Sequence, residues 1–384
     1  MKQVIRKTIV EANNINTEQP SYTLIVDGSS VLKTALVSNK VNQDGLEYGA
    51  ITNFFNIIRQ VIVKRDFSKC YVFFDDDLSG QLRAEIYPLY KANRDKHYNL
   101  NESDYDKKIN DYVKKVIEYS RQKKQQAKQS QYNETEDERY RRSRDIIIEI
   151  CEELFIRVYM AKYVEADDLC AYVVRHKKPN EKIYLISNDR DLAQLISSDV
   201  CLYVLNKKEY VIPSNCVDVL GCTHENIVLK KIFCGDVSDN ICGIKGLGEK
   251  TFFNLFPEAV STKLLVEDII TRANEINEQR KKEKKRPLKS CENIVNCVTD
   301  GIQGKSIYEV NKKIISLEEP LLTEEATEMM ESLTTLPLDE EGRDFKNLYR
   351  IVQENKINDL MDDGKLGDFF GAFNGLIYRE KHNR

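Results

Sequence analysis

The sequence is poor in the residues on which many hydrolases and metalloproteins depend. It contains four widely separated histidines without HExxH spacing, and its ten cysteines include no CxxC pair. With so few histidines and no such spacing, we do not expect zinc chemistry or a histidine-based catalytic triad. Any hydrolytic chemistry should therefore depend on carboxylates. We expect the cysteines to be reduced thiols that pack as small hydrophobic residues.

Long apolar runs are also missing. Hydrophobic residues make up 41% of the 384 residues and the mean hydropathy is −0.51. No apolar run approaches the roughly 20 residues that a membrane-spanning helix needs. Residues 1–21 form a polar lead-in without the features of a signal peptide. We therefore expect a cytoplasmic protein that does not contact membranes, with about two or three domains.

The net charge of −4 hides a local segregation of sign. Residues 107–128 carry eight basic residues and residues 280–289 carry seven, and each segment has a local net charge of +6. Residues 318–344, by contrast, contain ten acidic residues. Because basic surfaces can be local, the overall charge does not exclude a nucleic-acid partner.

Strand and helix patterns alternate over residues 22–213. This alternation predicts an α/β domain in which a mostly parallel sheet has helices on both faces. The polar residues 95–145 interrupt the pattern and predict an insertion of surface helices. Strand patterns stop near residue 214, and helical patterns continue to residue 384. The predicted strands are 22–27, 69–75, 155–160, 181–187, 201–205 and 209–212, and the predicted helices are 47–65, 140–153, 165–176 and 190–197.

Acidic residues recur where the predicted strands end and the following helices begin. In a parallel sheet these positions face one crevice. Glu165 and Asp168 are three residues apart on one helix face, and Asp236 and Asp239 repeat that spacing. The full set is Asp27, Asp75, Glu165, Asp167, Asp168, Asp189, Asp191, Asp236 and Asp239.

Converging carboxylates repel each other unless cations neutralise them. Oxygen ligands without Cys or His select Mg²⁺ or Mn²⁺, and two such ions about 4 Å apart are a common apparatus for phosphodiester hydrolysis. Any one of these acids alone could be an ordinary turn or capping residue. The whole set, in order and with paired spacings, favours a metal centre.

Five motifs resemble the 5′ nuclease superfamily, which comprises flap endonucleases, polymerase-associated 5′→3′ exonucleases and phage-type RNase H. They occur in family order, and the sequence LSGQLRAEIYPLYKANR is most similar to the phage branch. The motifs are VDGSS (26–30), FFDDDLSGQLRAEIYPLYKANR (73–94), YVEADDLCAYVV (163–174), ISNDRDLAQL (186–195) and CGDVSDNICGIKGLGEKT (234–251).

The resemblance implies a PIN-like nuclease domain at 22–213, with a helical arch or clamp inserted at 95–145. It also implies a helical, duplex-binding region at 214–384 that contains a helix–hairpin–helix-type (H2TH) motif at 234–257. The nine acids would bind two Mg²⁺ ions, with Mn²⁺ as a substitute, and main-chain carbonyls of the hairpin would bind K⁺. Asp76 and Asp77 are alternatives to Asp75, although the register of the strand end favours Asp75.

The resemblance also assigns the basic and aromatic residues. Lys91 and Arg94 match the residues that contact the scissile phosphate, and Arg83 would add positive charge for a dianionic transition state. Tyr90 would stack on the terminal base. An amphipathic basic helix and solvated lysines are the plain alternatives. The predicted strand-binding residues are Lys114, Lys115, Lys123 and Lys124, and the predicted duplex-binding residues are Gly243, Lys245, Gly246, Gly248 and Lys250.

The function implied is that of a 5′→3′ exonuclease and flap endonuclease with RNase H activity. Its partners would be DNA with a 5′ flap or nick, RNA·DNA hybrid and replication proteins such as a single-stranded DNA-binding protein. We expect a monomer that removes RNA primers, in the host cytoplasm if a phage encodes it. The alternatives are a PIN-like endoribonuclease, against which GIKGLGEKT argues, and an inactive structure-specific DNA-binding module. Segment 280–289 could touch duplex DNA or be a solubilising loop.

Overall fold

The fold is built around a six-stranded sheet with the order β3-β2-β1-β4-β5-β6. All neighbouring strands are parallel except β5 and β6, which pair antiparallel. The computed structural model describes residues 20–37, 40–92, 134–297, 301–302, 305–341, 343–361 and 364–382. The strands are β1 (Ser21–Asp27), β2 (Phe67–Asp75), β3 (Arg157–Ala161), β4 (Glu181–Ser187), β5 (Val200–Val204) and β6 (Glu209–Val211).

Both faces of the sheet are buried. In β1, Leu24 and Val26 contribute to one hydrophobic core, whereas Ile25 contributes to the other. In β2, Phe74 faces the first core and Phe73 the second. Because side chains alternate along a strand, a strand that is buried on both faces is almost continuously hydrophobic. The predicted α/β fold is confirmed.

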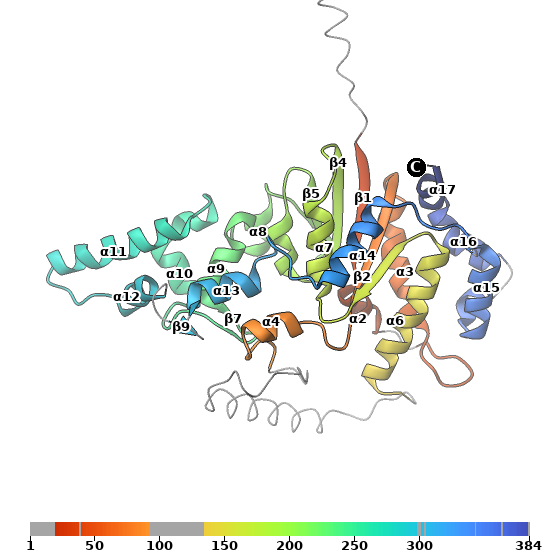
Figure 1. Ribbon diagram of the computed structural model, residues 1–384, viewed down its shortest axis with the longest axis horizontal. Coiled ribbons are helices and arrows are strands. Elements are labelled where there is room, and N and C mark those ends of the chain that lie inside the picture. Colours follow the sequence, from red (N-terminus) through yellow and green to blue (C-terminus); the bar gives the residue numbers. More distant parts are fainter. Residues whose placement is uncertain are drawn as a thin grey trace, which may run out of the picture.

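Helices cover both faces of the sheet (Figure 1). The first core is closed by α2, α3 and α6 together with the C-terminal helices α15, α16 and α17. The second is closed by α7, the 3₁₀ helix η2 and α14. The bounds are α2 (Gly28–Ala35), α3 (Gly49–Ile62), α4 (Gln81–Ile86), α6 (Glu136–Glu153), α7 (Ala166–Arg175), η2 (Arg190–Leu195), α14 (Glu324–Thr335), α15 (Phe345–Glu354), η5 (Asn358–Leu360), α16 (Lys365–Phe370), η6 (Gly371–Phe373) and α17 (Asn374–His382).

A second, mainly helical region extends to one side of the sheet (Figure 1). It has its own core around Phe233, Phe252 and Phe256, and a smaller core joins it to Tyr87 and Tyr90 near α4. Its elements are α8 (Cys216–Leu220), η3 (His224–Asn226), α9 (Ile227–Cys234), β7 (Gly235–Asp236), β8 (Ile241–Cys242), α10 (Glu249–Leu255), η4 (Pro257–Val260), α11 (Val266–Lys282), α12 (Lys289–Asn296), β9 (Gly301–Ile302), β10 (Lys305–Ser306) and α13 (Ile307–Ile315).

The structure corrects two predicted boundaries. The segment 214–384 is not one helical region, because Phe370, Phe373 and Leu376 from its C-terminal helices pack in the core of the nuclease sheet. The predicted insertion 95–145 overlaps α6, which begins at a capping box of Thr135 and Glu138 and buries Ser143 and Arg144. Residues 93–133 of that insertion lie outside the described residues.

Among the described residues, no helix combines the length and the apolar character needed to cross a membrane.

Candidate metal centre

The carboxyl ends of the parallel strands gather most of the predicted acids. Asp27 is the last residue of β1 and Asp75 the last residue of β2, and Asp189 follows β4, which pairs with β1. The Oδ1 atom of Asp75 accepts a hydrogen bond from the backbone N–H of Ala166 at 2.9 Å, at the start of α7. This bond fixes the helix that carries Asp167 beside the strand ends.

Glu165, Asp167 and Asp168 form a first carboxylate cluster, in which one oxygen from each residue lies within 4.8 Å of the others. Arg83 from α4 neutralises part of its charge. Its Nη1 atom lies 2.8 Å from Glu165 Oε2 and its Nη2 atom 3.1 Å from Asp168 Oδ1. Its Nε donates to the carbonyl of Ile314 in α13 at 2.8 Å. Burial raises the pKa of Asp167 and of Asp168, although Arg83 opposes both shifts.

Asp191, Asp236 and Asp239 form a second carboxylate cluster, in which one oxygen from each residue also lies within 4.8 Å of the others. Lys231 from α9 pairs with Asp191 and lies 2.6 Å from Asp236 Oδ2. Burial and the charge of Asp189 raise the pKa of Asp191 to about 6. For Asp236, burial is outweighed by Lys231 and by hydrogen bonds from Ser238, which together lower the pKa to about 2.

Asp27 is the most strongly shifted of the remaining acids. Its carboxylate accepts hydrogen bonds from the N–H of Ser30 at 2.9 Å and from the hydroxyl of Ser187 at 2.6 Å. Burial and the nearby charge of Asp75 nevertheless raise its pKa to about 7. A buried acid whose pKa rises this far lacks enough positive charge around it, which is a favourable setting for a cation.

Three consecutive acids stand at the end of β2, and Asp75 is the one that accepts the hydrogen bond from α7. Asp76 accepts a hydrogen bond from the N–H of Leu78 at 3.1 Å, within its own turn. Asp77 is exposed and its Oδ2 atom lies 3.3 Å from Nε of Arg141. This geometry favours Asp75 as the metal ligand, as the strand register does.

Lys91 connects the two carboxylate clusters. Its ammonium group pairs with Glu165 of the first cluster and lies 3.9 Å from Asp239 Oδ2 of the second. Its backbone N–H donates to the carbonyl of Asp239 at 2.8 Å. Lys91 has a φ of 51°, a left-handed conformation that costs a lysine about 1–3 kcal/mol. The surrounding contacts therefore hold its charge at one position between the clusters.

The roles predicted for Tyr90 and Arg83 are wrong for this structure. The Tyr90 ring is 2% exposed, so it has no face on which a base could stack, and its hydroxyl donates to Glu165 Oε2 at 2.7 Å. Arg83 is 3% exposed and bonded to Asp168 and Glu165, so it is an internal counter-ion and not a group that meets the substrate. Both side chains position the first cluster instead.

The glycine-rich hairpin joins α9 to α10, next to the second cluster. A Cβ on Gly243 would lie 2.2 Å from the carbonyl carbon of Cys234, so only glycine permits this approach of the two hairpin strands. Gly246 has a φ of 83°, and Gly248 precedes the first turn of α10. Lys245 and Lys250 are exposed. A cavity of about 620 Å³ runs from Gly248 to Asp189, Asp191 and Asp236.

The predicted site residues Arg94, Lys114, Lys115, Lys123 and Lys124 lie outside the described residues. Conversely, sequence reasoning missed Lys231. Its neighbour Lys230 pairs with Glu249 at 2.7 Å, so only the rotation of α9 decides which of the two lysines meets the acids. Ser187, which donates to Asp27, lies within the motif ISNDRDLAQL, but the motif alone assigns it no role.

Two solved structures of the bacteriophage T5 enzyme are similar in fold. One is the 5′-exonuclease with bound zinc, with a TM-score of 0.53 and 18% identity over 88% of this chain and 98% of that one. The other is the flap endonuclease in a complex with DNA and metal ions, with the same TM-score and identity over 87% and 99% of the two chains. At this identity the likeness concerns the fold, a PIN-like sheet.

Curated relatives match parts of the sequence. DNA polymerase I of Bacillus subtilis is 30% identical over 148 residues, which cover 37% of this chain and 16% of the polymerase. A 5′-3′ exonuclease of Buchnera aphidicola is 24% identical over 255 residues, which cover 64% of this chain and 73% of that protein. The family model described as "5'-3' exonuclease, N-terminal resolvase-like domain" matches residues 22–221. This match spans more than half of the chain, and the chain therefore belongs to the 5′-3′ exonuclease family.

Proposed function

We propose that this protein is a divalent-metal-dependent 5′→3′ exonuclease and flap endonuclease. The observation that carries this proposal is the arrangement of two carboxylate clusters with Lys91 between them. Such an arrangement suits phosphodiester hydrolysis, in which metal ions and a fixed cation share the charge that develops on the phosphate. We expect products with a 5′ phosphate.

The residues present fit divalent ions. All the donors are carboxylates, the ligand type that suits Mg²⁺ or Mn²⁺. Burial and neighbouring carboxylates raise the pKa of Asp27 and of Asp167, and a bound cation would favour their ionised forms. The ions would be held by Asp27, Asp75, Glu165, Asp167, Asp168, Asp189, Asp191, Asp236 and Asp239. When bound, they supply the charge that activates water and stabilises the phosphate.

The chain's own cations have different roles around these acids. Arg83 fixes Asp168 and Glu165, and Tyr90 orients Glu165 through its hydroxyl. Lys91 offers the ammonium group that best fits contact with the scissile phosphate, because it lies between the clusters. Arg94 is proposed for the same contact on the basis of the family motif. Lys231 neutralises Asp191 and Asp236.

The substrates that we propose are DNA with a 5′ flap or nick and RNA·DNA hybrid. The DNA complex of the T5 flap endonuclease, which shares the fold, supports the first. RNase H activity, removal of RNA primers and contact with replication proteins follow from the phage-type motif alone. We also infer a monomer in the cytoplasm, and a K⁺ held by carbonyls of the glycine-rich hairpin. Two of these carbonyls, those of Ile244 and Lys245, already accept hydrogen bonds.

One assay with purified protein tests the proposal. A 5′-labelled flap, a nicked duplex, an RNA·DNA hybrid and a single-stranded RNA hairpin are incubated side by side with Mg²⁺ or Mn²⁺. We expect cleavage of the flap, the nick and the hybrid, and none by Asp167→Asn. Cleavage of the RNA hairpin alone would favour the PIN-like endoribonuclease, and binding without cleavage would favour an inactive DNA-binding module.

A further inference from the structure

The helical hairpin formed by α11 and α12 ends in a strongly positive tip. We call residues 280–289 the basic tip, because they contain seven basic residues and only one acid, Glu283. α11 and α12 lie at the end of the molecule opposite to α15–α17 (Figure 1). Residues 281–287 are all exposed. The positive charge is therefore concentrated at an extremity of the helical region.

Hydrogen bonds hold the basic tip in one conformation. The Asn277 side chain donates to the carbonyl of Leu288 at 3.3 Å and accepts from its N–H at 2.7 Å, which closes the base of the turn. Arg280 Nε donates to the carbonyl of Arg286 at 2.8 Å, and the N–H of Lys285 donates to the carbonyl of Arg280 at 2.8 Å. A loop that only improved solubility would not need this order, because scattered charges serve that purpose equally well.

Helix stabilisation does not account for these charges. Arg280, Lys281 and Lys282 lie in the last turn of α11, where cations interact favourably with the helix dipole. Lys289, however, is the first residue of α12, where a cation is unfavourable. In the part of the chain that the structure describes, Lys285 pairs with Glu283 at 2.7 Å. In the same part, no carboxylate lies within 4.0 Å of the cationic groups of Lys281, Lys282, Lys284 and Arg286.

The basic tip is rigidly connected to the glycine-rich hairpin. The Asn293 side chain of α12 donates to the carbonyl of Lys245 at 2.8 Å. Ile269 of α11 and Cys291 of α12 share a hydrophobic core with Leu247 of the hairpin. α11 has 17 residues and is therefore about 25 Å long, and it carries the basic tip away from the sheet (Figure 1). The basic tip and the glycine-rich hairpin are therefore parts of one packed unit.

We propose that the basic tip is a second phosphate-binding site for duplex DNA, which contacts the same double helix that the glycine-rich hairpin binds, further from the nuclease sheet. This inference rests on the proposed function, because it assumes that the hairpin binds a duplex. Duplex DNA is the fitting partner because its phosphates form a regular array of negative charge, which matches the exposed cations of the tip.

The experiment compares duplex arms of two lengths. Four of the charges are removed together by Lys281→Gln, Lys282→Gln, Lys284→Gln and Arg286→Gln, and binding of flap DNA with duplex arms of 8 or 30 base pairs is measured by fluorescence anisotropy in Ca²⁺. We expect about 10-fold weaker binding of the long-arm substrate at 0.1 M salt, and a salt slope that is lower by about 0.9 for each phosphate that the variant no longer neutralises. Binding of the short-arm substrate should not change.

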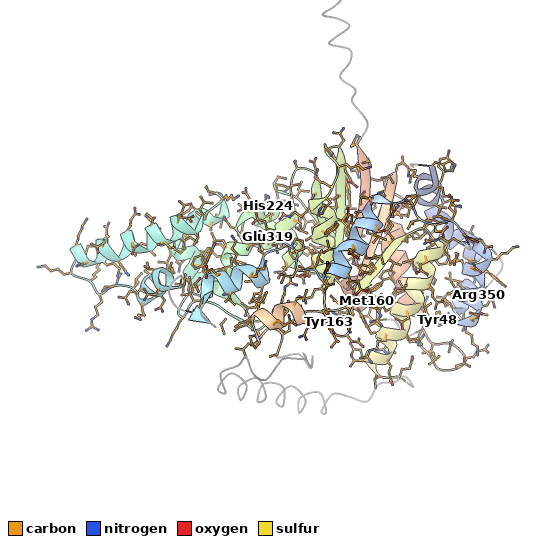
Figure 2. All side chains as sticks on the ribbon, viewed as in Figure 1. Tyr48, Met160, Tyr163, His224, Glu319 and Arg350 are labelled. Atoms are coloured by element: carbon orange, nitrogen blue, oxygen red, sulfur yellow. The ribbon has the colours of Figure 1, made fainter. Side chains whose placement is uncertain are left out.

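A matched control removes four exposed charges elsewhere, at Lys64, Lys182, Lys346 and Arg350. Arg350 lies on α15, far from α11 (Figures 1 and 2). This control should bind both substrates as the wild type does. Equal affinity of the tip variant and the wild type for long arms would overturn the inference, and so would an equal loss for both arm lengths. Because binding is measured without cleavage, an inactive wild type that still shows the arm-length effect would contradict the proposed nuclease function and leave the basic tip supported.

Discussion

The two carboxylate clusters differ in how their negative charge is balanced. In the first cluster the buried counter-ion is Arg83, a planar guanidinium that is 3% exposed and bonded to α7 and to the carbonyl of Ile314, and Lys91 also pairs with Glu165. In the second it is Lys231, a flexible ammonium whose side chain is 19% exposed. A guanidinium in a bidentate pair is fixed, whereas a lysine at the edge of a cavity can rotate away.

This difference indicates separate tasks for the two clusters. In the first, Arg83 and Tyr90 already hold the acids at the start of α7. The second is assembled from η2 and from the β7–β8 hairpin after α9, and so depends on contact between the sheet and the helical region. Lys231 there occupies the position of a cation and would compete with a metal ion. We therefore expect the first cluster to be preformed and the second to respond to metal and substrate.

The largest effect should come from removing a carboxylate of the first cluster. Asp167→Asn should lower single-turnover cleavage of a 5′ flap by about 10³-fold or more while DNA binding persists, because the acids serve the ions and phosphate contacts elsewhere supply affinity. Asp236→Asn in the second cluster should cost about 10²-fold. Asp77→Asn, in an exposed acid near Asp75, is the control and should cleave normally. Equal losses in the first two variants would remove the distinction between the clusters.

Arg83, the buried counter-ion of the first cluster, should have the larger effect on the stability of the fold. Arg83→Ala leaves Asp168 buried without its partner, so we expect the free energy of unfolding in urea to fall by about 3–5 kcal/mol in metal-free buffer. Arg141→Ala, in an exposed pair with Asp77, should change it by less than about 1 kcal/mol. Mg²⁺ should restore part of the loss in Arg83→Ala. A loss below that of Arg141→Ala would show that Arg83 does not stabilise the cluster.

Lys91, whose ammonium group lies between the two clusters, should affect the rate of the cleavage step. Lys91→Ala should reduce the single-turnover rate by roughly 10²-fold with little change in substrate affinity, as expected for a group that acts on transition-state charge. Lys162→Ala is a suitable control, because Lys162 is exposed and lies against the Tyr163 ring, 4.7 Å from its centroid. If Lys91→Ala weakened binding alone, Lys91 would be a docking residue.

Much of the site was predictable because it depends on local patterns. A strand that ends in Asp, or a helix that begins with two acids, fixes the acid at one sheet edge, and this accounts for seven of the nine positions. Asp236 and Asp239 lie instead in the hairpin after α9. The roles of Arg83 and Tyr90 depend on packing instead. The carbonyl that Arg83 meets, at Ile314, is 231 residues away in sequence, and no local pattern reveals that α13 covers it.

Packing also explains the misplaced C-terminal boundary. The apolar periodicity of residues 345–376 predicts helices but not the surface that they cover. In the structure Phe370 and Phe373 pack against Phe55 of α3, with ring centroids 5.5 and 6.2 Å apart. The C-terminal helices pack on α3 and α6. The apolar surface that they cover exists only after these two helices have packed on the sheet, so the local sequence does not reveal it.

Lys231, the counter-ion of the second cluster, should affect metal affinity more than stability. Lys231→Met removes the ammonium group that competes for Asp191 and Asp236, so we expect Mn²⁺ to bind the second cluster about 5- to 10-fold more tightly in calorimetry. Lys230→Met, in the neighbouring lysine, should leave this affinity unchanged. Weaker Mn²⁺ binding in Lys231→Met would mean that Lys231 orders the cluster for the metal.

The smallest effect concerns pH. Burial and Asp75 raise the pKa of Asp27 from 3.8 to about 7. An acid with a raised pKa in the folded state stabilises the fold at low pH, and this stabilisation is lost as the pH rises from about 4 to about 7. Because Mg²⁺ binds the ionised form, its effect on the melting temperature should be larger at pH 7.5 than at pH 5.5, by roughly 3 °C. An equal effect at both values would argue against Asp27 as a ligand.

The most direct test of the account is the number of divalent ions that the two clusters bind. Mn²⁺ binding is counted by equilibrium dialysis in the wild type and in the double variant Asp236→Asn with Asp239→Asn, which alters only the second cluster. We predict two ions for each wild-type chain, one ion in the double variant, held by the first cluster, and one ion in Asp167→Asn, held by the second cluster. A wild type that binds no ion, or the same number bound by all three proteins, would contradict the assignment of these acids to a two-part metal centre.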